Sequence, residues 1–92
     1  MKTFYLNCIE SGYNLLTGLL EAGVSIDHII SLSPEQAKKH NVSGYRDFST
    51  ISDKYNIPIY YPQKFSLNGE RDIEFIKKEA PDLMMVLGWQ RL

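Results

Sequence analysis

Two stretches of this 92-residue sequence carry side chains that could bind a small molecule. The first is the segment Gly88–Trp89–Gln90–Arg91–Leu92, which follows a continuous apolar run. A glycine at the end of a strand lets a ligand approach the backbone closely, and Trp89 offers a flat apolar wall that suits a heteroaromatic ring. The alternative is that Trp89 and Leu92 only pack beneath a helix that follows.

The second stretch is the loop at residues 7–14, which leads into a predicted helix that begins at Ser11. Free amides and the helix dipole favour an anion at such a position. A capped turn, in which Ser11 makes only a local hydrogen bond, is an equally good interpretation. The loop has one glycine where the dinucleotide fingerprint needs three, and Ser31 and Ser33 end the next strand without a ribose-binding acid, so an NAD enzyme is not predicted.

The remaining reactive residues do not form a catalytic set. Cys8 lies near a helix start, but it has no second cysteine at redox spacing and is predicted to pack. His28 and His40 have no partner at metal-ligand spacing and are predicted to be surface or scaffold residues. Asp47 resembles an N-cap, and Asp82 is placed to pair or cap at the start of a strand. We therefore predict no metal site and no catalytic residue.

Composition limits the partners of the chain. The net charge is -1, with 10 basic and 11 acidic residues, so no clustered positive surface for nucleic acid is predicted. The apolar run at the N-terminus is too short for a membrane span or a signal sequence. A single cysteine fits a reducing compartment. We expect a single cytoplasmic domain over residues 1–92 that contacts neither nucleic acid nor a membrane.

Strands and helices alternate along the chain. Leucines at helical spacing between Ser11 and Gly23, and β-branched runs elsewhere, support this assignment. Prolines at both ends of the third strand indicate a sheet edge. The predicted elements are strand 2–8, helix 11–22, strand 26–32, a helix of at most two turns from Ser33, helix 47–55, strand 57–62, helix 69–79 with Ile73 and Ile76 on its apolar side, and strand 82–88.

This alternation predicts a Rossmann-like α/β fold, an open parallel sheet of four strands in the order 3-2-1-4 with helices on both faces. The ligand crevice then lies beyond the carboxyl ends of strands one and four. Residues 83–87 are apolar at every position, which is typical of a strand covered on both faces. Because so few residues follow, we expect the first half of a larger domain. We also expect the uncovered flank of strand 82–88 to form a homo-oligomer.

Several motifs, in this order, resemble the N-terminal half of the formyltransferase domain. They are Cys8–Ile9–Glu10–Ser11–Gly12–Tyr13, Ser43–Gly44–Tyr45–Arg46–Asp47, Ile57–Pro58, Pro81–Asp82 and Gly88–Trp89–Gln90–Arg91–Leu92. The resemblance covers essentially the whole chain. The family includes glycinamide ribonucleotide, methionyl-tRNA and sugar-nucleotide formyltransferases, which use 10-formyltetrahydrofolate.

The resemblance implies a folate cofactor and a small-molecule amine substrate. By position, the pterin contacts fall on Val86, Gly88, Trp89, Arg91 and Leu92, and the substrate side falls on Ser11, Gly12, Tyr13 and Asn14. The asparagine, histidine and aspartate of the family have no counterpart here, since neither His28 nor His40 stands in the catalytic position. The given chain is therefore expected to be catalytically incomplete and to bind folate weakly. The alternative is a non-catalytic α/β module that oligomerises or binds a ligand.

Overall fold

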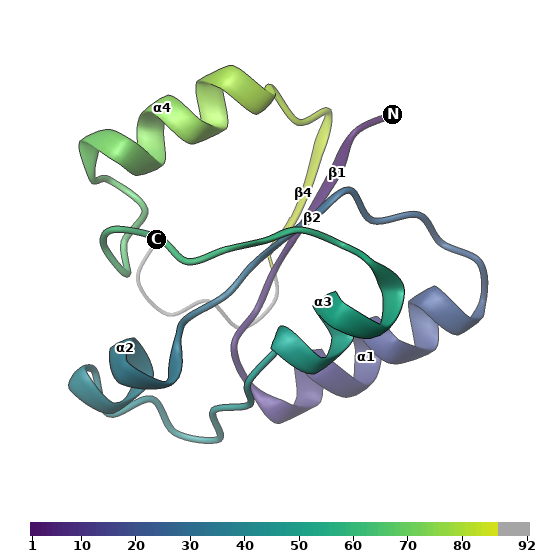
Figure 1. Ribbon diagram of the computed structural model, residues 1–92, viewed down its shortest axis with the longest axis horizontal. Coiled ribbons are helices and arrows are strands. Elements are labelled where there is room, and N and C mark those ends of the chain that lie inside the picture. Colours follow the sequence, from purple (N-terminus) through teal and green to yellow (C-terminus); the bar gives the residue numbers. More distant parts are fainter. Residues whose placement is uncertain (87–92) are drawn as a thin grey trace.

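The computed structural model describes residues 1–86, which form four strands and four helices (Figure 1). The strands and helices follow one another in the predicted order, including the two short helices between the second strand and the third. The elements are β1 (Thr3–Leu6), α1 (Glu10–Glu21), β2 (His28–Ile30), α2 (Pro34–Lys39), α3 (Ser49–Tyr55), β3 (Ile59–Tyr60), α4 (Glu70–Glu79) and β4 (Leu83–Val86).

The four strands form one parallel sheet in the order β3-β2-β1-β4. Leu6 at the end of β1 is paired with Ile30 of β2 on one side and with Val86 of β4 on the other. The predicted α/β class and strand order are therefore confirmed. The two-residue strand β3 lies at one edge, as the prolines around it predict.

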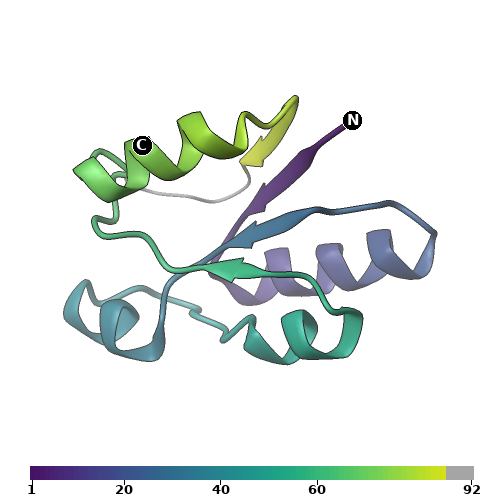
Figure 2. The same cartoon turned by 45° about the horizontal axis from the view of Figure 1, so that its top comes forward.

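The sheet separates two hydrophobic cores because successive side chains of a strand point to opposite faces. Tyr5 and Ile29 face the core that α1 and α3 cover, whereas Phe4, Leu6 and Ile30 face the core beneath α4 and the loop before it. Figure 2 shows α4 on one side of the sheet with α1 and α3 on the other. Side chains of the second core that come from outside the sheet include Phe65, Leu67 and Phe75.

Helix α1 begins one residue earlier than predicted, and Ser11 is not its N-cap. Ile9 occupies that position, and no side chain caps the helix there. The prediction of the C-terminus is confirmed: Gly23 has φ +90°, its amide donates to Leu20 O, and the next amide, of Val24, donates to Leu19 O. These two hydrogen bonds form a Schellman motif, which favours glycine at this position.

The N-cap of α2 was predicted correctly, whereas that of α3 was not. Ser33 and Gln36 form a reciprocal capping box at the start of α2, with Pro34 as the first helical residue, as the sequence indicates. Helix α3 begins later than predicted, with Phe48 at its N-cap. Asp47 acts one residue ahead of that position, where its carboxylate accepts from the Ser49 amide at 2.9 Å. Its predicted capping position is therefore wrong by one residue.

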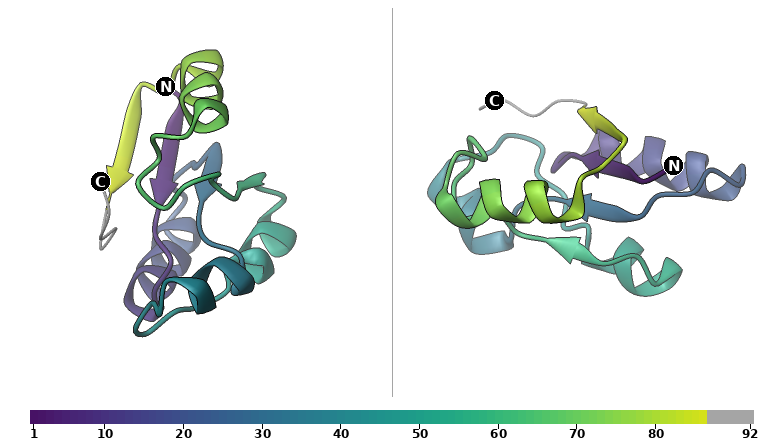
Figure 3. Two further views of the ribbon diagram at one scale, coloured as in Figure 1. Left: turned by 90° about the vertical axis from the view of Figure 1, so that its left-hand side faces the viewer. Right: turned by 90° about the horizontal axis from the view of Figure 1, so that it is seen from above.

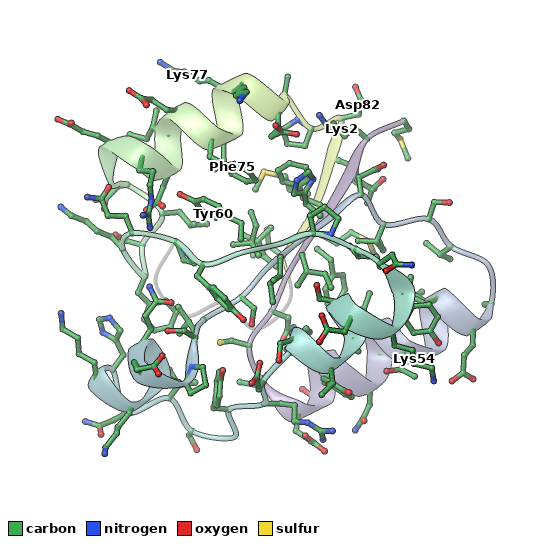
Figure 4. All side chains as sticks on the ribbon, in the orientation of Figure 1. Lys2, Lys54, Tyr60, Phe75, Lys77 and Asp82 are labelled. Atoms are coloured by element: carbon green, nitrogen blue, oxygen red, sulfur yellow. The ribbon has the colours of Figure 1, made fainter. Side chains whose placement is uncertain are left out.

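The inward face of α4 differs from the apolar side that the sequence predicts. Ile73 is 42% exposed, whereas Asp72 is fully buried and Phe75 stacks on Tyr60 with ring centroids 4.0 Å apart. Tyr60 and Phe75 lie against each other below α4 in Figure 4. The helix turns Asp72 inward because the hydroxyl of Tyr60 and two loop amides donate to its carboxylate.

Strand β4 lies at the second edge of the described sheet, next to β1 (Figure 3). Its central residues face opposite cores, Met84 towards the α4 side and Met85 towards the α1 side. Leu83 and Val86 remain about 40% exposed, at 43% and 39%. Each face of the described part of β4 is therefore covered at one methionine, while the residues at its two ends remain partly exposed.

Candidate functional site at the carboxyl ends of β1 and β4

The carboxyl ends of β1 and β4 meet where the connections of the sheet change direction. From β1 the chain passes through α1 to β2 on one side, and from β3 it passes through α4 to β4 on the other. Helices that lie on opposite faces leave a crevice between such strands, and this is where open α/β sheets bind ligands. Val86 is paired with Leu6 at this point. Segments 7–14 and 43–46 form the neighbouring surface.

Asn7 is a buried polar residue at the end of β1 that the sequence analysis did not select. It is 1% exposed, and its side-chain oxygen accepts from the Ile9 amide at 3.0 Å. Its carboxamide lies directly on Gly12: a Cβ atom at Gly12 would lie 1.9 Å from Asn7 Cγ. Gly12 is therefore required for the close approach of α1 to the end of β1, and its predicted role on the substrate side is untested.

The first turn of α1 places backbone amides at the same edge of the sheet. The Glu10 amide donates to Gly44 O at 2.9 Å, and the Tyr13 amide makes the first intrahelical hydrogen bond, to Ile9 O. Between them lie the amides of Ser11 and Gly12, which have no acceptor within a helix. Amides at these positions favour a polar or anionic group near the helix start.

Tyr13 is held in place by neighbours from another segment. The Arg46 guanidinium lies 3.9 Å from the centroid of the Tyr13 ring and donates to both carboxylate oxygens of Glu10, at 3.0 and 2.9 Å. The Tyr13 hydroxyl is 2.7 Å from Thr50 Oγ1. Tyr13 therefore forms a fixed wall beside the helix start. The motif that contains Arg46 was noted in the sequence, but its contact with Glu10 was not predicted.

The other two residues of the predicted substrate loop, Ser11 and Asn14, are exposed on the first turns of α1. Of the predicted folate contacts, Val86 is described and lies at the end of β4, beside Leu6. The remaining predicted contacts, Gly88, Trp89, Arg91 and Leu92, lie outside the described residues. The structure thus brings Val86 and the loop at Ser11 to the same end of the sheet.

Ser31 adds a second buried polar group at this end of the sheet. It follows β2, and its hydroxyl is fully buried without a hydrogen-bond partner among the described residues. The neighbouring Asn7 amide donates to Ile30 O, so the two polar residues continue adjacent strands. Buried polar groups are usually paired, so this hydroxyl is one of the exceptions among the described residues.

Cys8 has the packing role that the sequence predicts. Its side chain is 1% exposed within the core beneath α4, and burial raises the pKa of its thiol to about 11. A thiol with such a pKa is protonated near neutral pH, so Cys8 is not an activated nucleophile. Its carbonyl instead accepts from the Arg46 amide, which ties the loop after β1 to segment 43–46.

The histidines lie apart from this edge or serve as scaffold. His28 contacts the rings of Phe4 and Phe75, with its Nε2 4.0 Å from a Glu79 oxygen. His40 caps the end of α2 and contacts Phe65. Within residues 1–86, no group of three or more histidine, cysteine, aspartate or glutamate side chains could hold a metal ion. None of the described helices has both the length and the apolar character to cross a bilayer.

Comparisons of this sequence with protein-family models and with curated proteins find no match.

Proposed function

We propose that this chain is part of a folate-dependent formyltransferase, in which the end of β4 contacts the pterin of 10-formyltetrahydrofolate. The pairing of Val86 with Leu6 at the switch point of the sheet supports this proposal most directly. Val86 is the first residue of the predicted pterin contacts, and this pairing places it beside the last residue of β1, directly before the loop at residues 7–14. A pterin on the β4 side and an amine on the α1 side would then share one crevice.

In the proposed reaction, the amine nitrogen attacks the formyl carbon of the cofactor. A bond forms between that nitrogen and the carbon, the bond from the carbon to N10 of the folate breaks, and the amine proton passes to the departing folate nitrogen. Polar groups that face the developing oxyanion would stabilise the intermediate. We assign no described residue to that role. The amides of Ser11 and Gly12 and the wall at Tyr13 contribute to binding of the substrate.

The experiment that tests this proposal uses the single tryptophan as a reporter. The chain is titrated with 5-formyltetrahydrofolate, an unreactive analogue, while the indole N–H resonance of Trp89 is followed. We expect a saturable shift with a dissociation constant on the order of 1 mM, equivalent to about 4 kcal/mol. Val86→Asp should weaken binding at least about tenfold, because it replaces an apolar contact with the face of the pterin by a charged carboxylate that must lose water.

Leu83→Asp is the matched control, because Leu83 lies on the same strand with similar exposure but is paired with Thr3 at the opposite end. This variant should bind the folate as the parent chain does. Equal losses in Leu83→Asp and Val86→Asp, or no shift at millimolar folate, would contradict the placement of the cofactor.

The second candidate function is an α/β module that oligomerises through β4. Its support is the exposure of Leu83 and Val86 on an edge strand, a combination that favours pairing with another chain. In this case sedimentation at tens of micromolar, well above a dissociation constant of about 1 μM, should detect a homodimer. Leu83→Asp and Val86→Asp should both produce the monomer. A monomeric parent chain would refute this function and leave the folate test unaffected.

A further inference from the structure

A groove with a volume of about 250 Å³ lies between the end of α2 and the loop that joins β3 to α4. Figure 1 shows these two segments on the same side of the molecule, at its left. The residues that line it include two lysines, a histidine, a glutamine and a serine, but no acidic residue. The lining residues are Lys39, His40, Gln63, Lys64, Phe65 and Ser66.

The two lysines of this groove have no carboxylate partner among residues 1–86. Ion pairs in this part of the chain involve only Lys2, His28 and Arg46 as the basic partners. Lys39 and Lys64 come from different segments, so the fold brings their like charges to one groove. Since the chain as a whole carries a net charge of -1, this positive surface is a local feature.

Buried contacts hold the loop side of the groove in one conformation. Asp72 accepts from the Gln63 amide at 2.6 Å and from the Lys64 amide at 3.0 Å. Phe65 is 5% exposed in the core, and its ring centroid lies 5.1 Å from that of His40. The two walls are therefore in contact with each other, and a preorganised groove loses little entropy when a ligand binds.

The C-terminal end of α2 repels an anion less than a helix C-terminus ordinarily does, because its last carbonyl groups accept hydrogen bonds. The carbonyl of Ala37 accepts from the Val42 amide at 3.0 Å, and that of Lys38 accepts from the Asn41 amide at 3.3 Å. Asn41 adopts φ +51°, as the αL position of a Schellman motif requires. These hydrogen bonds occupy carbonyl groups that would otherwise present partial negative charge.

We propose that this groove binds the diphosphate group of a small molecule. A lysine from each wall, Lys39 and Lys64, matches a ligand with several anionic oxygens, whereas a single carboxylate would satisfy only one of them. Gln63 Oε1 already accepts from the Arg71 amide, so its NH₂ group is the part that remains to donate to a ligand. The groove adjoins the loop after β3, away from the β1–β4 junction, so this inference does not depend on folate binding.

The test is calorimetric titration of the full chain with pyrophosphate at low ionic strength and fixed pH. Pyrophosphate should bind saturably, and Lys39→Ala/Lys64→Ala should weaken its binding at least about tenfold. The matched control is Lys77→Ala/Lys78→Ala, which removes the same charge from the exposed face of α4, where Figure 4 labels Lys77. This control should change the affinity less than about twofold, because the Coulomb energy between these more distant charges and the ligand is smaller.

Parallel titrations with inorganic phosphate and a nucleoside diphosphate identify the source of the ligand. Weaker binding of phosphate than of pyrophosphate supports recognition of a diphosphate. If the nucleoside diphosphate binds at least as tightly as pyrophosphate, the diphosphate group belongs to a nucleotide. If the nucleoside diphosphate binds more weakly than pyrophosphate, the ligand is free pyrophosphate or a smaller diphosphate. Equal losses in the two double variants would show diffuse surface charge and overturn the proposal, as would the absence of pyrophosphate binding.

Discussion

Replacement of Gly12 by alanine is expected to destabilise the chain by about 3 kcal/mol, the upper part of the range for an overpacked core. The added Cβ would lie 1.9 Å from Asn7 Cγ and 2.1 Å from both terminal atoms of that side chain. Asn7 cannot move away freely, since it is buried and its oxygen accepts from the Ile9 amide. Either this hydrogen bond breaks or α1 shifts away from the sheet. Urea denaturation measures the change.

Gly18 provides a control in the same helix. A Cβ atom there meets no other atom within 4 Å, so Gly18→Ala should stabilise the chain by about 0.5–1 kcal/mol through helix propensity alone. The double variant Gly12→Ala/Asn7→Ala should lose less stability than the two single changes together, because it removes the clash. Stabilisation by Gly12→Ala, or strict additivity with Asn7→Ala, would contradict the contact.

Replacement of Asp72 by alanine should have a still larger effect, about 3–5 kcal/mol, because it leaves several buried donors without an acceptor. The carboxylate accepts from Tyr60 Oη at 2.7 Å and from the amides of Gln63 and Lys64. Such a loss approaches the total stability of a domain of this size, about 5 kcal/mol at the low end. Glu74→Ala, an exposed change on the same helix, should lie within about 0.5 kcal/mol of the parent.

Asp72 also predicts how stability depends on pH. Burial raises the pKa of its carboxyl, but hydrogen bonds from Tyr60 and from the amides of Gln63, Lys64 and Gly69 outweigh this effect and lower the pKa below its ordinary value. The unfolded chain then binds the proton more tightly than the folded chain does. The stabilisation by the ionised Asp72 is therefore complete above the pKa of this carboxyl in the unfolded chain, about 3.9. It is lost as the pH falls through the lower pKa of the same carboxyl in the folded chain.

Asp72→Asn isolates this dependence because it keeps the shape of the side chain without its charge. The difference in unfolding free energy between the parent and Asp72→Asn should be constant near neutral pH and should shrink below about pH 4. A difference that stays constant down to the acid unfolding transition would mean that Asp72 does not carry the lowered pKa.

Local sequence signals predicted the order of elements and several of their ends. Gly23 ended α1, Ser33 began α2, and the prolines around Ile59 placed β3 at an edge. These features depend on the backbone preferences of a few neighbouring residues, so a short stretch contains the information. The alternation of strands and helices then restricted the sheet to a parallel order, because crossovers of one hand allow few topologies.

The contacts between segments depended on the tertiary structure. Three such contacts join residues whose types alone suggested caps, loops or surface positions. They are the contact of Asn7 with Gly12, that of Arg46 with Tyr13, and the hydrogen bonds from the amides of Gln63 and Lys64 to Asp72. The sequence analysis selected Ile73 for the inward side of α4, where the structure buries the charged Asp72 instead. Three donors, one from β3 and two from the loop after it, outweigh the cost of burying that charge, and only the folded path of the chain brings them together.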